Sequence, residues 1–352
     1  MEKSSAGVST VSGEEVQVLV LKLERCKGTL LSELPLVDLS QQRDAVKKAP
    51  PPKHLVQTES IFRHLEHLGI MSSQGVPCFI ELGCGTAKLS DHVSERLGGQ
   101  CSHVLIDKKA ASSFKAERLR DGSIRHRLQP SHRFVRIAAD LQDKDLLRSV
   151  MLDELTKTTS PSLKDTHATK TNFIAISKHL CGAAADYAIQ GLDYFASVDT
   201  CHAPPPFVVA TCCHHRCEEV SFSNMDFFRY LGFSRRDFEV LQKVTHWFSI
   251  KVKRADLDEA TNDEGGVQYA SLPPLPPEPF SMDIEGFSSS QLVPSQKFER
   301  EFTREEKAAL GKRCKLALDT ARGHALKRIG YSDIRFVRYT THSLEDTLLI
   351  AM

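Results

Sequence analysis

The chain has 352 residues, of which 41% are hydrophobic and 26% are charged. A chain of this length can form one large domain or two ordinary ones, with ample apolar residues for a core. Its 46 lysines and arginines nearly balance 45 acidic residues, and the net charge of +1 excludes a uniformly basic nucleic-acid binder. Met1-Glu2-Lys3 leads into no apolar segment, and there are ten cysteines. We therefore expect no secretory signal, reduced thiols and a cytoplasmic or nuclear location.

The first 52 residues are expected to be loosely structured, and Ala49-Pro50-Pro51-Pro52 indicates a stiff spacer. Their one apolar run, Val16–Leu23, contains Gln17 and Lys22 and is too short to span a bilayer, so we expect no membrane association. A helix is predicted over Lys53–Ile70, where Leu55, Ile61, Leu65 and Leu68 form an apolar stripe.

The segment FIELGCGTAKLSDHV, Phe79–Val93, predicts a strand, a glycine turn and a helix. Gly83 and Gly85 let the backbone adopt conformations that a Cβ forbids and let a ligand approach closely. Lys88 stands where a dinucleotide fingerprint has its third glycine, and the P-loop spacing is absent. A strand with the acidic Glu81 near its end and a short glycine loop fits S-adenosylmethionine better than a pyrophosphate. The alternative is an ordinary glycine turn.

Four further apolar runs each end in polar residues. The runs at 103–106 and 134–139 end at Asp107 and Asp140, and the runs at 172–177 and 207–210 end at KHLCG and TCCHHRC. Because ligands of open α/β sheets bind outside the carboxyl ends of the strands, this repetition indicates one site. We predict that the cofactor contacts Glu81, Gly83, Gly85 and Asp107, with Asp107 on its ribose and Asp140 near its adenine.

Residues 251–300 are rich in proline, acidic residues and serine, and we expect a flexible insertion. Thr303 and Glu306 indicate a capping box at the start of a long helix, which Gly323 or Gly330 ends. Strands are predicted at 334–339 and 347–351. The fold class is therefore α/β, a class I S-adenosylmethionine-dependent methyltransferase (Rossmann-like) sheet with a C-terminal antiparallel strand pair. Its domain covers 53–352, interrupted by the insertion.

Two basic clusters stand out within this balanced composition. One runs from Lys108 to Arg136, and the other from Lys307 to Arg328. Such clusters can contact phosphates, but each is equally typical of a solvated helix face, which is the interpretation we favour for either cluster alone.

With these motifs assembled, the chain resembles the eukaryotic tRNA 2'-O-methyltransferases of the Trm-thirteen type, which act on nucleotide 4 of the acceptor stem. The resemblance covers residues 53 to 352 apart from the insertion, and its motifs are KHLVQTESI, FIELGCGTAKLSDHV, SKHLCGAAADYAI, VVATCCHHRC, GKRCKLALDTAR and SLEDTLLIA. It implies S-adenosylmethionine as methyl donor and the tRNA acceptor stem as partner. No protein partner is indicated.

The N-terminal region departs from that family pattern. Family members usually begin with small Cys/His zinc modules, whereas Cys26 is the only cysteine here before Cys78. The chain is similar to a truncated isoform or an abbreviated relative, which bears on how strongly it holds tRNA by itself.

Methylation of a ribose 2'-hydroxyl requires alignment and removal of a proton from a weak acid. Lys178 is our first candidate for the base, because a partly desolvated lysine loses its proton more readily. Glu345 is the candidate acidic partner, and His214 and His215 are alternative bases. For the substrate we assign Lys88, His179 and Arg216, the last as a phosphate clamp.

The motif CCHHRC also admits a metal site. Cys212 and Cys213 are expected on opposite faces of an extended strand, and therefore not on one metal. Cys213 and Cys217 meet only if the chain turns helical, with His214 or His215 and a distant Cys181. Zinc sites more usually show paired C-x2-C spacing, so we predict a substrate-facing loop and no metal. A cysteine nucleophile among Cys84, Cys181, Cys212 and Cys213 is a third interpretation, which a hydroxyl acceptor does not need.

Two alternatives to the tRNA enzyme stay open. One is a methyltransferase of the same fold that acts on an RNA base, a protein or a small molecule. The other is a catalytically silent RNA-binding relative.

Overall fold

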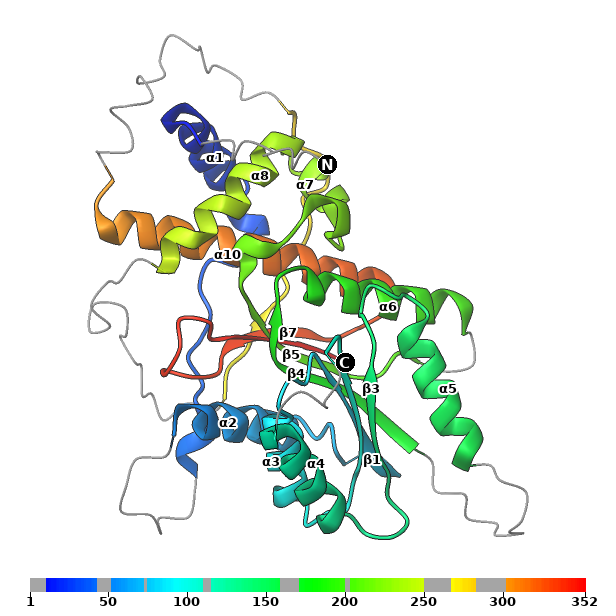
Figure 1. The fold of residues 1–352 in the computed structure, drawn as a ribbon. Helices are drawn as coiled ribbons and strands as arrows, with labels where there is room; N and C mark the ends of the chain where they lie inside the picture. The colour runs from blue at the N-terminus through cyan, green and yellow to red at the C-terminus, as the bar shows by residue number, and fades with distance from the viewer. Residues whose placement is uncertain are drawn as a thin grey trace, which may run out of the picture. The chain divides into compact units, whose positions relative to one another are not determined.

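The computed structural model describes residues 11–42, 52–72, 75–109, 115–158, 171–199, 203–249, 267–282 and 302–352 (Figure 1). The chain divides into two compact units, which we describe separately. The larger, α/β unit comprises Glu33–Asn224, Ala260–Leu272 and Asp319–Met352, and the smaller, helical unit comprises Met1–Ser32, Met225–Glu259 and Pro273–Leu318.

A single sheet of eight strands forms the centre of the α/β unit. Its spatial order is β3-β2-β1-β4-β5-β8-β7-β6. The strands are β1 (Val76–Leu82), β2 (Ser102–Asp107), β3 (Phe134–Ala138), β4 (Thr171–Cys181), β5 (Phe207–Cys212), β6 (Ala270–Ser271), β7 (Ile334–Arg338) and β8 (Thr347–Ala351).

The first five strands are parallel, and β8 pairs antiparallel with both β5 and β7. The predicted fold class is confirmed: this is the mostly parallel sheet with an antiparallel C-terminal pair that class I methyltransferases have. The strand order runs outward from β1 in one direction and from β4 in the other. Such a reversal leaves a crevice at the carboxyl ends of these two strands.

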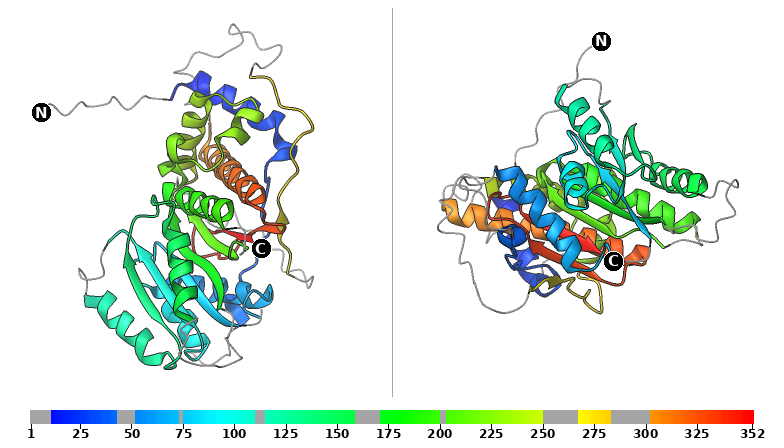
Figure 2. Two further views of the ribbon diagram at one scale, coloured as in Figure 1. Left: turned by 90° about the vertical axis from the view of Figure 1, so that its right-hand side faces the viewer. Right: turned by 90° about the horizontal axis from the view of Figure 1, so that it is seen from below.

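Helices cover both faces of the sheet, which is why the parallel strands are apolar on both sides (Figures 1 and 2). One group is α2 (Lys53–His67), α3 (Lys88–Arg96) and α4 (Lys115–Arg127), and the other contains α5 (Leu146–Thr158) and α6 (Ala183–Val198). The main core joins α2 and α3 to five strands through Ile61, Phe62, Phe79, Val93, Ile174, Val208, Val337 and Ile350. None of the described helices is both long and apolar enough to cross a membrane.

Helix α10 (Arg304–Ile329) resolves the choice between its two candidate stop signals. The capping box forms, since the Thr303 amide donates to Glu306 and the Glu306 amide to Thr303 Oγ1. Gly323 lies inside the helix, where a Cβ would come within 2.8 Å of the Phe336 ring, so this glycine permits close packing on β7. Gly330, with a φ of +116°, follows the last helical residue.

Two segments are more regular than their composition indicates. Within the N-terminal 52 residues, α1 (Gly13–Arg25) begins with a Ser12–Glu15 capping box, and its buried Lys22 ion-pairs with Asp237 at 2.8 Å. The sequence did not predict α1 because its apolar run is only eight residues long. The helix is stabilised by packing against a partner helix, α8 (Arg235–Val244).

The described part of the predicted insertion, residues 267–282, contributes β6, which pairs with β7. Tyr269 beside it hydrogen-bonds His64 at 2.7 Å. The rest of the insertion lies outside the described residues. That residues 53–352 act as one methyltransferase domain stays a prediction.

Candidate functional site

A pocket of about 500 Å³ opens at the carboxyl ends of β1 and β4, where the strand order reverses. The first turns of α2, the end of β1 with the glycine turn that leads into α3, the start of α3 and the end of β4 line it. Its residues are Lys53, His54, Gln57, Glu81, Gly83, Cys84, Gly85, Thr86, Lys88, Leu89, Lys178 and His179. Six residues selected from the sequence for cofactor, substrate or catalysis therefore share one cavity.

The glycine turn is held open by the neighbouring strand. Gly83 and Gly85 have φ values of +61° and +46°, which side chains rarely adopt. The Gly85 amide donates to Asp107 Oδ2 at 2.8 Å, and Oδ1 of the same carboxylate accepts from the Lys109 amide. Nothing lies within 4 Å of where a Gly85 Cβ would be, so the turn borders open space. Asp107 thus positions the loop and keeps lone pairs for a ligand's hydroxyl groups.

Glu81 has a structural task besides lining the pocket. Its carboxylate is 3% exposed, and it accepts hydrogen bonds from the amide and the hydroxyl of Ser90 at 3.0 and 2.5 Å. These bonds join β1 to the first turn of α3. Burial raises the pKa of Glu81 to about 7, although the Ser90 bonds and the charge of Lys178 oppose the rise.

A β-bulge places the predicted base in the pocket. Ser177 pairs with Val209 and Leu180 with Thr211, so Lys178 and His179 together face the single residue Ala210. Burial and the charge of Lys88 lower the pKa of Lys178 to about 8. Burial, together with Lys178, lowers the pKa of His179 to about 4. Near neutral pH the histidine is uncharged, and a fraction of the lysine is a free amine.

Asp140 lies apart from the pocket lining. It follows β3, and its carboxylate forms an ion pair with Lys108 at 2.7 Å. The hydrogen bond and charge of this lysine lower the pKa of Asp140. The structure therefore brings Glu81, Gly83 and Gly85 together with Asp107 beside them, while the contact of Asp140 with an adenine stays a prediction.

The remaining candidate residues gather at the ends of β5 and β8. His214, 1% exposed, bonds Asp319 through Nε2 at 2.9 Å, and its Nδ1 lies 3.9 Å from Glu345 Oε2. Asp319 therefore fixes this histidine by a hydrogen bond, whereas Glu345 lies near its other ring nitrogen without a hydrogen bond to it. His215 and Arg216 occupy the same short helix and are exposed. None of these four lines the pocket, so they form a second cluster beside it.

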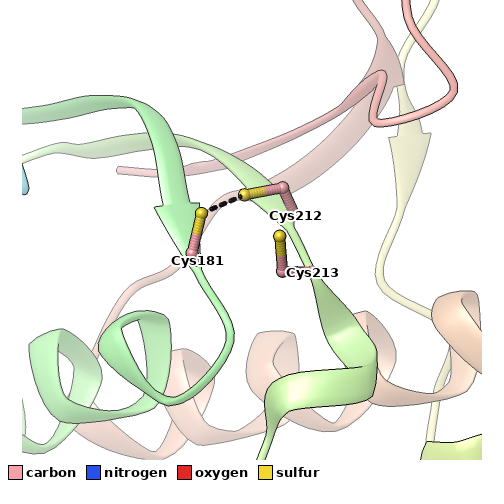
Figure 3. A group of neighbouring side chains, drawn as sticks. All are labelled: Cys181, Cys212 and Cys213. Carbon is pink, nitrogen blue, oxygen red and sulfur yellow. Dashed lines mark hydrogen bonds between the residues drawn. The ribbon is translucent and has the colours of Figure 1, made fainter.

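Three thiols also meet at these strand ends (Figure 3). The Sγ atoms of Cys181, Cys212 and Cys213 all lie within 4.8 Å of one another, and the first two are 3.0 Å apart. The expectation that Cys212 and Cys213 point to opposite faces is wrong. Strand β5 ends at Cys212, and Cys213 has a φ of +51°, a left-handed conformation that returns its side chain to its neighbour's side.

Cys217, the other cysteine considered for a metal site with Cys213, lies elsewhere: its Sγ is 2.9 Å from an Arg322 nitrogen. Cys84 is the cysteine of the pocket lining, and burial raises its pKa well above the usual value, which keeps it protonated. The Cys84 thiol is therefore poorly suited to act as a nucleophile.

Sequence reasoning missed a buried charge network behind the second cluster. Arg322 forms a bidentate pair with Asp186 and a further bond to Asp319 at 3.1 Å, and all three residues are 0% exposed. Asp319 and Arg322 stand one turn apart among the apolar residues of α10, and this interruption of an apolar face was the available signal. The segment KHLVQTES carries polar residues between its apolar ones, and three of them, Lys53, His54 and Gln57, line the pocket.

Several residues of the basic cluster between Lys108 and Arg136 form ion pairs, hydrogen bonds or ring contacts within the protein. Arg136 pairs with Asp121 at 2.7 Å, Arg127 with Asp91 at 3.1 Å, and Arg125 lies over the Phe134 ring. Arg120 donates to the Thr86 carbonyl of the pocket wall at 2.6 Å. These contacts fix α4 against the cofactor-side loop, so these arginines stabilise the fold in addition to giving the surface its charge.

A buried carboxylate holds α2, one wall of the pocket, to α3. Glu59 accepts from Arg63 on its own helix at 2.9 Å and from His92 on α3 at 2.7 Å. Burial alone would raise its pKa, but the His92 bond and the charges of Arg96 and Arg63 lower it to about 2. Because the folded-state pKa is depressed, this stability is present above the unfolded value of 4.5 and is lost as the pH falls from there toward 2.

We expect Glu59→Gln to lower the free energy of unfolding at pH 7 by roughly 3 kcal/mol, and the difference from wild type to shrink near pH 3. Urea unfolding at both pH values measures this. The matched control is Glu66→Gln, which removes an exposed partner of the same Arg63 and should cost less than about 1 kcal/mol. Equal losses in the two variants, or a loss independent of pH, would contradict the role of Glu59.

The strand order, the glycine turn after β1 and the pocket at the switch point define a class I methyltransferase. The family model described as Methyltransferase TRM13 matches residues 56–352, and the chain belongs to this family. No solved structure matches the chain at a significant level.

Curated relatives are distant in sequence. The human protein named tRNA:m(4)X modification enzyme TRM13 homolog is 24% identical over 98% of this chain and 75% of its own length. The Dictyostelium discoideum homolog of the same name is 28% identical over 56% of this chain and 34% of its own. The Schizosaccharomyces pombe enzyme is 27% identical over 70% and 62%. The chain thus spans between a third and three quarters of these relatives.

Proposed function

We propose that this chain transfers a methyl group from S-adenosylmethionine to the ribose 2'-hydroxyl of nucleotide 4 in the tRNA acceptor stem. Membership of the methyltransferase family supports the reaction class. The relatives' names, which specify a tRNA modification at m(4)X, support the acceptor and its position. The ribose as target rests on the resemblance of the motifs.

The pocket suits a nucleoside-sized cofactor. Its volume of about 500 Å³ lies in the range of small-molecule sites. The glycine turn offers backbone without side chains, and Asp107 offers carboxylate oxygens where a ribose would be recognised. Lys53 and Lys88 give the cavity positive charges that favour a carboxylate. S-adenosylmethionine, when bound, supplies a methyl group activated by a sulfonium.

Lys178 is the base in this proposal, and the bulge at the end of β4 is the observation that carries it. The bulge turns a lysine of lowered pKa into the cavity that the glycine turn lines. As a free amine, Lys178 accepts the proton of the ribose hydroxyl as the oxygen attacks. Lys88 and His179, which line the same cavity, hold the acceptor strand.

The second cluster is proposed to bind the acceptor on the other side of the bulge. Arg216 is exposed beside the Gly182 turn, where it can contact a phosphate. Glu345 and His214 lie within 3.9 Å of each other, which makes them the alternative proton-accepting pair. The neighbouring His215 is exposed, which makes it the weaker candidate for a base.

Location of the transferred methyl group tests the proposal. The full chain is incubated with methyl-labelled S-adenosylmethionine and unmodified tRNA transcript, and the RNA is then hydrolysed in alkali. A 2'-O-methyl group at nucleotide 4 leaves one alkali-resistant phosphodiester after that nucleotide, and a transcript with a 2'-deoxy residue at position 4 is the matched control. Label in the deoxy transcript would indicate a base acceptor, and no label in either RNA despite cofactor binding would indicate a silent relative.

A further inference from the structure

The thiols at the ends of β4 and β5 form a site that the methyl transfer does not use. Cys181 ends β4, Cys212 ends β5, and Cys213 follows directly, so the two neighbouring strands and the turn after them each bring a sulfur to one point (Figure 3). We propose that Cys181, Cys212 and Cys213 bind one zinc ion as thiolates, with the fourth position open to solvent.

The distances fit a tetrahedral ion. With a Zn–S bond of about 2.3 Å, sulfurs on one zinc are about 3.8 Å apart. The present sulfur–sulfur separations are 3.0 Å for the closest pair and at most 4.8 Å within the group. Side-chain movements of about 1 Å bring them to that value. Iron–sulfur clusters take four cysteine ligands, whereas this group has three members among the described residues.

The backbone is bent to bring the sulfurs together. Cys213 adopts a left-handed conformation, with a φ of +51°, that a residue with a side chain rarely adopts. Gly182, directly after Cys181, has φ +55° and ψ −126°, and a Cβ there would lie 2.7 Å from Arg216 Cβ. One of these two positions is itself a member of the group, and the other directly follows a member. A single S–H···S hydrogen bond needs neither of them.

The charges around the group favour a cation between the sulfurs. Three thiolates within 4.8 Å of one another repel each other unless a cation lies among them. Cys181 precedes the N-terminus of α6 and Arg216 lies beside Gly182, and both positive groups favour a thiolate at this edge of the group. A divalent ion removes the remaining repulsion, and the thiol protons are released to solvent.

Two further features suit the group to a metal ion: an entry path from solvent and a hydrogen bond between the two strand ends. Cys181 and Cys213 are only partly buried, which leaves an entry path for the ion. The Gly182 amide donates to the Cys212 carbonyl at 3.1 Å and fixes the two strand ends relative to each other. Because Lys178 and His179 lie two to three residues before Cys181, a bound zinc would hold the bulge that presents them.

Metal content and cobalt absorption of the full chain test the site without reference to methyl transfer. Elemental analysis of chain purified with zinc present should find about one zinc per chain, and Co²⁺ added to chelator-treated protein should give thiolate-to-metal charge-transfer absorption. Cys213→Ser should lose both signals while its far-ultraviolet circular dichroism stays that of wild type.

Cys217→Ser is the matched control from the same motif. Its sulfur contacts Arg322 outside the group, and a serine oxygen preserves an acceptor for that arginine, so this variant should keep about one zinc. Three results overturn the proposal: wild-type chain without zinc or cobalt absorption, equal loss in Cys217→Ser, or an intact mass two hydrogens lighter that maps to a Cys181–Cys212 disulfide.

Discussion

Lys178→Ala is expected to lower the rate of methyl transfer by roughly 10²–10⁴-fold, the contribution of a positioned general base. The cofactor should bind with unchanged affinity to within a few-fold, because the glycine turn and Asp107 hold their geometry without the lysine. Single-turnover transfer to tRNA measures the first quantity, and calorimetry with S-adenosylmethionine measures the second. Turnover near that of wild type would remove Lys178 from the mechanism.

The pH dependence separates a base from a mere positive charge. Burial lowers the pKa of Lys178 to about 8, and only the free amine accepts a proton, so the wild-type rate should rise with pH and level off above about 8. Lys178→Arg keeps the charge but stays protonated, and it should be as inactive as the alanine variant at every pH. A small primary amine added to Lys178→Ala should restore part of the rate. An active arginine variant would assign the lysine to substrate binding alone.

The sheet could be predicted because strands that are buried on both faces have a simple sequence pattern. Runs such as Phe207–Ala210 are apolar without alternation, and each is followed by the polar residues of a strand end. Since the carboxyl ends of parallel strands share one edge, the convergence of the glycine turn and Lys178 followed from the order of these runs alone. The sites at the ends of β1 and β4 were therefore accessible to sequence reasoning.

The local backbone geometry at the ends of β4 and β5 could not be predicted in the same way. A bulge at Lys178 depends on how β4 pairs with β5, and the left-handed Cys213 depends on where that pairing stops. Both are properties of two segments together, whereas a periodic pattern describes one. The same holds for Arg322, whose partners Asp186 and Asp319 include a residue 136 positions away in sequence.

Arg322→Met is expected to give the largest loss of stability. The guanidinium donates to Asp186 through two nitrogens, at 2.8 and 3.2 Å, and to Asp319 at 3.1 Å, and no part of the three side chains reaches solvent. Methionine fills much of the volume but leaves two buried carboxylates without a counter-charge. Removal of one partner from a buried pair costs roughly 3–5 kcal/mol, and the loss of the guanidinium from two buried acids at once places this variant at the upper end. The melting temperature should fall by about 10 °C or more.

Two comparisons show whether charge or packing is responsible. Arg229→Met removes an arginine from the exposed pair with Asp226 and should cost less than about 1 kcal/mol. Combining Arg322→Met with Asp186→Leu and Asp319→Leu removes the stranded acids and should recover part of the lost stability, since an apolar replacement of a whole buried ion network is often neutral. Because Asp319 also orients His214, the triple variant should recover stability without recovering that histidine's hydrogen bond. A triple variant less stable than Arg322→Met would show that packing, and not uncompensated charge, dominates this part of the core.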